Sequence, residues 1–119
     1  MFVTLDIAKQ YLRVDSADDD ALIAFMLPGA EQRCIDIARL TPEEVAELGK
    51  VDLDDDGNVI SVRTDAFDTG EVIQIRETMR IAVLYALTYM YEHREDSDQH
   101  ELNVTLRSLL CAVRERRLF

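Results

Sequence analysis

Apolar residues recur at helical spacing along most of the chain. From Leu22 to Leu40 they fall three or four positions apart, which is the period of one face of an α-helix. This spacing predicts helices over residues 5–13, 17–39, 71–95 and 103–116. Polar and turn-forming residues fill the segment 50–70 between the helical halves. We therefore expect one all-α domain spanning residues 1–119, a small helical bundle with one long central helix and a long loop or small hairpin at about 50–70.

Residues that favour helix ends support these boundaries. Thr4 is placed to cap the first helix, and Ser16 to cap the second, with Asp19 three positions on as the acid of a capping box. Thr41 is followed by a proline and two glutamates, a pattern that opens a short helical turn. Asn103 is placed to cap the last helix.

A proline interrupts the second predicted helix. Pro28 has no backbone N–H and cannot donate to the carbonyl of Ala24, four residues earlier. We expect a kink or a break in the helix at this point.

The central helix is apolar on nearly every side between Ile81 and Tyr91. A helix of this kind is buried on several faces, and a domain of this size has few other residues to pack against it. The pattern therefore indicates contacts with other subunits. The candidate subunit-interface residues are Tyr85, Tyr89, Met90 and Tyr91.

The run from Val51 to Arg63, VDLDDDGNVISVR, resembles the start of a calcium-binding EF-hand loop. Its aspartates alternate and a glycine follows, but the twelfth position holds Arg63 where the chemistry requires a bidentate glutamate. Asp56-Gly57 between apolar runs also favours a tight hairpin turn. We expect a hairpin or acidic loop without EF-hand calcium binding. We further expect 50–70 to be mobile and to become ordered against a neighbouring subunit or the next ring of an assembly.

Composition and charge narrow the possible functions. Hydrophobic residues make up 48% of the 119 residues, which excludes a wholly disordered chain. Residues 1–74 hold 17 acidic and 6 basic side chains, whereas residues 75–119 hold 7 of each. Such an acidic surface is poorly suited to binding the phosphates of nucleic acid. We expect no membrane-spanning segment and no signal peptide, and the two isolated cysteines indicate a reducing cytoplasm.

The candidate chemical groups form no recognisable catalytic set. His93 and His100 are seven positions apart, but no cysteine or further histidine completes a zinc site. The sequence contains neither a glycine-rich phosphate loop nor a nucleophile elbow. We expect no enzymatic activity, no metal site and no cofactor.

Several short motifs resemble those of the head–tail connector (adaptor) family of long-tailed bacteriophages. Residues 3–15, VTLDIAKQYLRVD, and 18–23, DDDALI, are similar to the family's first two helix starts. Residues 82–95, AVLYALTYMYEHRE, with the preceding Ile75-Arg76, resemble its long helix. The segment 106–110, LRSLL, followed by Arg114, is similar to its closing motif. The segment 41–70 has no counterpart in this pattern.

The resemblance implies a structural virion protein without catalytic residues. Such proteins are small and helical and form a ring, usually of about twelve copies, beneath the portal of a filled capsid. The implied partners are further copies of the chain, the portal protein and a stopper or tail-completion protein. DNA crosses the ring without sequence-specific binding. The implied location is the head–tail interface of the virion, after synthesis in the host cytoplasm.

Two segments have roles under this hypothesis. The first is a C-terminal segment that docks on the portal and comprises Arg114, Arg116, Arg117, Leu118 and Phe119. The second is an acidic loop facing the channel, which comprises Asp52, Asp54, Asp55 and Asp56. The alternative interpretation is a small acidic helical binding module or calcium-responsive adaptor, which rests on the acidic run alone.

Overall fold

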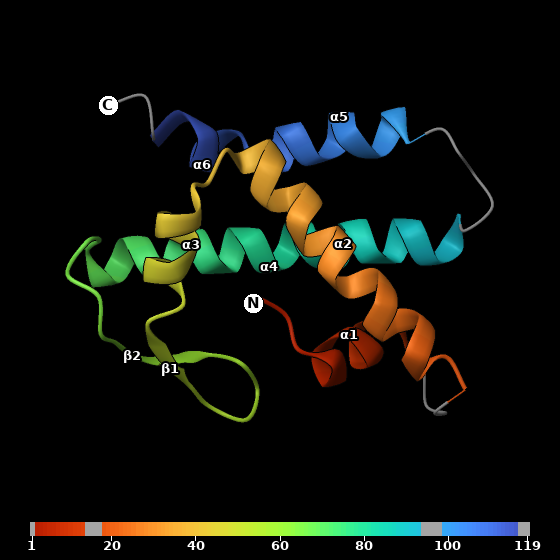
Figure 1. Cartoon of the computed structure of the whole chain (residues 1–119), viewed down its shortest axis with the longest axis horizontal. Coiled ribbons are helices and arrows are strands. Elements are labelled where there is room, and N and C mark those ends of the chain that lie inside the picture. The colour runs from red at the N-terminus through yellow and green to blue at the C-terminus, as the bar shows by residue number, and fades with distance from the viewer. Residues whose placement is uncertain (1, 14–17, 94–98, 117–119) are drawn as a thin grey trace.

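The computed structural model describes residues 2–13, 18–93 and 99–116, with side chains up to residue 114. Within these residues the chain forms six helices and one two-stranded sheet (Figure 1). The predicted all-α fold with a small hairpin is confirmed. The elements in chain order are α1 (Leu5–Leu12), α2 (Asp20–Ala38), α3 (Pro42–Leu48), β1 (Val51–Leu53), β2 (Val59–Val62), α4 (Thr69–Glu92), α5 (His100–Leu109) and α6 (Cys111–Arg116).

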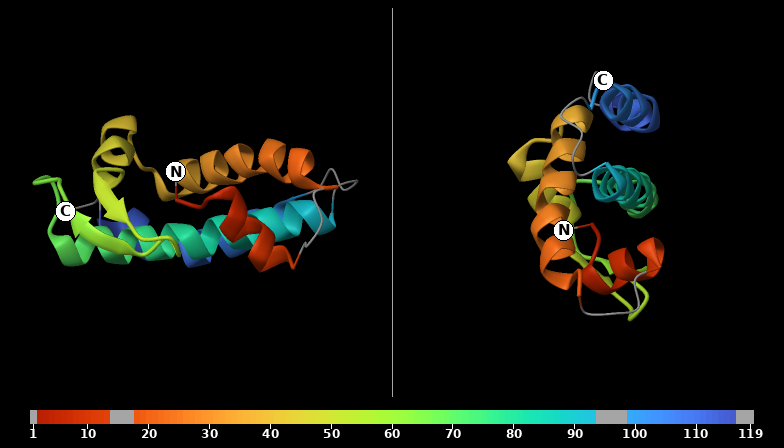
Figure 2. Two further views of the ribbon diagram at one scale, coloured as in Figure 1. Left: turned by 90° about the horizontal axis from the view of Figure 1, so that it is seen from below. Right: turned by 90° about the vertical axis from the view of Figure 1, so that its right-hand side faces the viewer.

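The helices are arranged in two layers. The helices α1, α4 and α5 lie side by side in one layer, and α2 crosses all three in the other (Figures 1 and 2). The molecule is flat, with principal extents of 41 × 32 × 19 Å. The hairpin of β1 and β2 extends along the edge next to α1, on the opposite side of α4 from α5.

The long helix α4 is covered mostly by its own chain. Because α1 and α5 flank it and α2 packs across it, buried residues occur on several of its sides, including Val72, Met79, Val83 and Leu87. The all-round apolar pattern therefore reflects a central position within one domain. The side of α4 that faces away from α2 remains exposed.

We expected a kink or a break at Pro28, and because helix α2 runs through this residue the break is wrong. Pro28 and Ala24 both lie on the exposed side of the helix, where water can satisfy the carbonyl that the proline leaves without a donor. The helix begins at Asp20, with Asp19 at the N-cap position and not three residues inside the helix. The predicted cap Ser16 lies outside the described residues.

The other helix ends confirm some sequence signals and correct others. Thr4 accepts a hydrogen bond from the N–H of Ile7 at 3.3 Å, and Thr41 and Glu44 form a complete capping box for α3. The last predicted helix is two helices, which meet at Leu110. Because α5 begins at His100, Asn103 is not its cap but lies inside its first turn.

Candidate interaction surfaces

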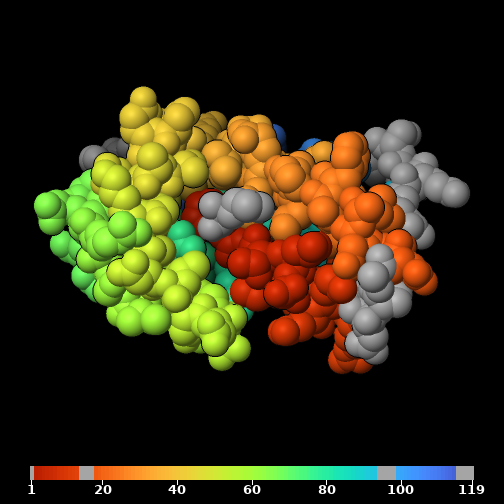
Figure 3. Space-filling view, turned by 60° about the horizontal axis from the view of Figure 1, so that its bottom comes forward, coloured from red at the N-terminus to blue at the C-terminus, as the bar shows by residue number. Residues whose placement is uncertain are grey.

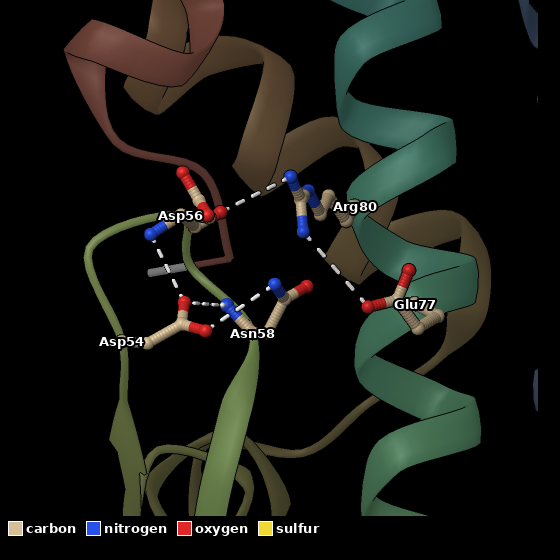
Figure 4. Close-up of polar contacts among 5 residues, drawn as sticks. All are labelled: Asp54, Asp56, Asn58, Glu77 and Arg80. Carbon is tan, nitrogen blue, oxygen red and sulfur yellow. Dashed lines mark hydrogen bonds and ion pairs between the residues drawn. The ribbon is translucent and has the colours of Figure 1, made fainter.

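The acidic run forms an ordered hairpin whose turn is held by Asp54 (Figure 4). The Asp54 carboxylate accepts hydrogen bonds from the N–H of Asp56 at 3.0 Å and of Asn58 at 2.8 Å. The backbone closes the same turn, because the N–H of Gly57 donates to the Asp54 carbonyl at 3.0 Å. These bonds hold the pKa of Asp54 below its usual value, and the bond from the Asn58 N–H has the largest effect.

This geometry weakens the calcium interpretation. The carboxylate of Asp54 is already occupied by backbone donors, and Arg63 lies 3.5 Å from the carboxylate of Asp52. A bidentate carboxylate at the twelfth loop position is what completes an EF-hand site, and a guanidinium occupies that position here. Among the described residues, no three His, Cys, Asp or Glu side chains are grouped to hold a metal ion.

The hairpin tip packs against its own chain. A Cβ atom added to Gly57 would lie 2.7 Å from Cδ1 of Ile7, and Arg80 donates to the Asp56 carbonyl at 3.4 Å. The hairpin and α1 accordingly occupy adjoining parts of one surface (Figure 3). The expected loop that becomes ordered only against a neighbour is instead a hairpin with contacts to α1 and α4.

The four acidic residues of the predicted channel loop divide into two kinds. Asp52 accepts a hydrogen bond from Ser61 and pairs with Arg63, and Asp54 holds the turn. Asp55 and Asp56 are exposed, and the Asp56 carboxylate points away from the Asp54–Asn58 contacts (Figure 4). All four aspartates are exposed, so each contributes negative charge to the surface of the hairpin.

Three of the four predicted interface residues have contacts inside the chain. The ring of Tyr89 stacks on His93 with 4.2 Å between centroids, and the Tyr91 hydroxyl donates to the carboxylate of Asp19. Met90 packs against the core. Tyr85 differs because it is 38% exposed on the outer side of α4.

Two exposed apolar patches lie on opposite layers of the molecule. We call the first the α2 patch; it consists of Ala21, Ala24, Phe25 and Pro28, and Phe25 is 83% exposed. We call the second the α4 patch; it consists of Ile73, Ile81 and Tyr85. Since α2 and α4 pack against each other, their exposed sides face opposite directions (Figure 2). The sequence analysis identified Tyr85 but missed Phe25, because the whole segment 21–30 is apolar and its exposed side is not evident from spacing.

A buried polar network ties the N-terminal segment to the core. The Glu31 carboxylate accepts from the N–H of Phe2 at 3.0 Å and of Val3 at 3.1 Å. The guanidinium of Arg76 lies 5.5 Å from the centroid of the Phe2 ring and donates to the Leu48 carbonyl at 2.8 Å. Burial lowers the pKa of Arg76. The network joins the N-terminal segment to α2 and links α3 to α4, which indicates a structural role.

The remaining candidate residues are only partly described. Arg114 is half-buried at α6, while the side chains of Arg116, Arg117, Leu118 and Phe119 lie outside the described residues. Of the two thiols, Cys34 is buried and Cys111 is exposed. Burial raises the pKa of Cys34 to about 12, so this thiol stays protonated at neutral pH.

Comparison with protein-family models, with curated proteins and with solved structures gives no match. Among the described residues, none of the helices has the length and apolar character needed to cross a membrane. The exposed surfaces described above and the sequence motifs therefore provide the evidence for a function.

Proposed function

We propose that the chain is a structural virion protein that assembles into a ring beneath a phage portal. The ring joins the DNA-filled head to the tail and extends the channel that DNA crosses. The observation that carries this proposal is the pair of exposed apolar patches on opposite layers of the fold. The motifs at 3–15, 82–95 and 106–110 support the connector family as the type of assembly.

Two different patches on opposite faces favour head-to-tail association. If the α2 patch of one copy meets the α4 patch of the next, each copy keeps one free patch for a further neighbour. Such contacts form a ring when the rotation between neighbours closes. Burying a large side chain such as Phe25 contributes about 1.5–3 kcal/mol. A ring repeats this contribution at every interface.

The acidic hairpin fits a conduit for DNA. Asp55 and Asp56 are exposed, and phosphates are repelled by a surface of like charge. In the proposed ring the hairpin faces the channel and lets DNA pass without specific binding. The C-terminal segment beginning at Arg114 docks on the portal, and a stopper or tail-completion protein binds the opposite side of the ring. No enzymatic step and no cofactor belong to this function.

The first test measures self-association of purified protein by analytical ultracentrifugation and native mass spectrometry. Phe25→Ser and Ile81→Ser each remove one patch, and we expect each to weaken association at least about tenfold, which corresponds to 1.4 kcal/mol. Tyr11→Ser is the matched control, because Tyr11 is 53% exposed on α1 and belongs to neither patch. Unchanged association in both patch variants would contradict the proposal.

The second test asks whether the chain joins heads to tails. In a phage that lacks this gene, we expect DNA-filled heads and separate tails to accumulate, visible by electron microscopy. Supplying the chain restores complete particles, whereas the Phe25→Ser variant does not. Normal particle yield without the chain would contradict the proposal.

A further inference from the structure

A groove with two arginines lies between α2 and α5, on the far side of α4 from the hairpin. Helix α2 contributes Gly29, Arg33, Asp36 and Ile37, and α5 contributes Asn103 and Arg107. Its volume of about 470 Å³ lies in the range of about 300–1,000 Å³ that is typical of binding pockets.

The polar groups of the groove suit a carboxylate. Arg33 is half-buried and is positioned by a hydrogen bond of 2.9 Å from its Nη1 to Oδ1 of Asn103. This bond uses one guanidinium N–H of the several that arginine carries, so others remain for a ligand. Arg107 supplies a second, exposed guanidinium. The one acid of the groove, Asp36, accepts from Gln32 at 2.8 Å.

The hairpin tip has the complementary chemistry. Asp55 and Asp56 are exposed carboxylates on a turn whose shape Asp54 fixes, so little conformational freedom is lost on binding. Ile60 is 68% exposed on the neighbouring strand β2. The apolar part of the groove, formed at Ile37, can receive such a side chain.

The placement of the two features excludes contact within one copy. Figure 1 shows α5 and the hairpin on opposite sides of α4, and Figure 2 shows the same arrangement from another direction. When a groove and a projection lie on opposite edges of one molecule, the projection of one copy can contact the groove of the next.

We propose that the acidic hairpin tip of one copy docks in the Arg33–Arg107 groove of the next copy. This proposal rests on the proposed ring, and it identifies the polar contact that sets the register between neighbours. The arginine–aspartate contact selects which edges of neighbouring copies meet and in which orientation. This contact replaces the channel-facing role given to Asp55 and Asp56 in the proposed function, and the ring itself does not depend on that role.

The first experiment reverses charges. We expect Arg107→Glu to weaken self-association at least about tenfold at low salt, and Asp55→Arg to do the same, because each places like charges together. The double variant R107E/D55R restores association to within about threefold of the unmodified chain, because the pair is reformed with the charges exchanged. Weakening by both single variants without restoration in the double variant would overturn the proposal.

Matched controls separate this contact from a general effect of charge. Arg13→Glu applies the same charge change to an exposed arginine after α1, and Asp65→Arg applies it to an exposed acid after β2. Both are expected to leave association unchanged. If the controls weaken association as strongly as the groove variants, net charge accounts for the result and the proposal fails.

The second experiment locates the contact directly, even where association is weak. A spin label is attached to Asp55→Cys in a Cys111→Ser background and mixed with isotope-labelled, unmodified chain at millimolar concentration. Cys34 is buried and stays unlabelled. We expect intermolecular broadening at the amides of Gly29, Ile37 and Asn103.

The outcomes distinguish this inference from the proposed function. Broadening confined to other sites shows self-association through different surfaces, so the groove assignment fails while the ring stands. The groove assignment also fails, and the ring also stands, if Phe25→Ser weakens association and Arg107→Glu leaves it unchanged. No broadening at any site means that copies do not associate, and both proposals fail.

Discussion

The same hydrogen-bonding arrangement occurs in two regions of the molecule, one buried and one exposed. Glu31 and Asp54 each use one carboxylate to hold two backbone N–H groups, those of Phe2 and Val3 in the first case and of Asp56 and Asn58 in the second. Glu31 is 6% exposed, whereas Asp54 is exposed. Water can replace Asp54 as an acceptor but cannot reach the donors at Glu31. The buried carboxylate therefore stabilises the fold, and the exposed one mainly shapes a surface.

The largest effect is expected from Glu31→Ala. Loss of the carboxylate leaves two buried N–H groups without an acceptor, each at a cost of about 1–3 kcal/mol, so we expect the free energy of unfolding to fall by about 2–6 kcal/mol. Urea denaturation followed by circular dichroism measures the change. Glu92→Ala, at an exposed position on α4, serves as the control and is expected to stay within about 0.5 kcal/mol. Equal effects in the two variants would remove the distinction between the buried and exposed carboxylates.

Gly57→Ala is expected to have the next largest effect. Gly57 has φ +85°, and an added Cβ would lie 2.7 Å from Cδ1 of Ile7. The backbone conformation alone costs about 1–2 kcal/mol for a residue with a side chain, and the contact with α1 must also shift. We expect the free energy of unfolding to fall by at least this amount.

The matched glycine is Gly70, in the first turn of α4, where nothing lies within 4 Å of an added Cβ. Gly70→Ala is expected to stabilise the protein by about 0.4–1 kcal/mol, because alanine restricts the unfolded chain without straining the helix. Thermal denaturation of the two variants should therefore give shifts of opposite sign. Stabilisation by Gly57→Ala would contradict the close contact of the hairpin tip with α1.

A smaller and local effect is expected from Asp54→Ala. The variant should speed amide hydrogen exchange at Asp56 and Asn58 while leaving the helices unchanged, because only the turn depends on this carboxylate. Asp55→Ala is the control, since Asp55 is exposed beside it. Faster exchange throughout the helices would contradict the local role.

The pH dependence of the hairpin should follow Asp54. Hydrogen bonds from Asn58 and Asp56 lower the pKa of Asp54 below its ordinary value of 3.8. A lowered pKa in the folded state means that the stabilisation is complete above the unfolded pKa and is lost as pH falls through the folded pKa. Nuclear magnetic resonance titration should show the turn loosening only below the ordinary value of 3.8. Loosening at neutral pH would contradict this assignment.

Much of the fold follows from the sequence because its signals are local. Helical spacing predicted the main helices, Thr4 and Thr41 predicted two of the caps, and Asp56-Gly57 predicted the hairpin. Each of these signals depends on a residue and its neighbours within one turn. The break at Pro28 was wrong because the proline and Ala24 lie on the exposed side of α2, and the cap at Asn103 was wrong because α5 begins earlier, at His100.

The sequence by itself determined that this chain forms helices joined by an acidic hairpin, since periodicity and turn chemistry act over short separations. Only the tertiary structure decided which apolar residues are exposed. Phe25 and Ile23 are equally apolar and two positions apart, yet one is 83% exposed and the other 0%. The groove between Arg33 and Arg107 likewise exists only because α2 crosses α5, which brings together residues far apart in the chain. Contacts over such separations depend on the packing of whole helices and leave no local pattern.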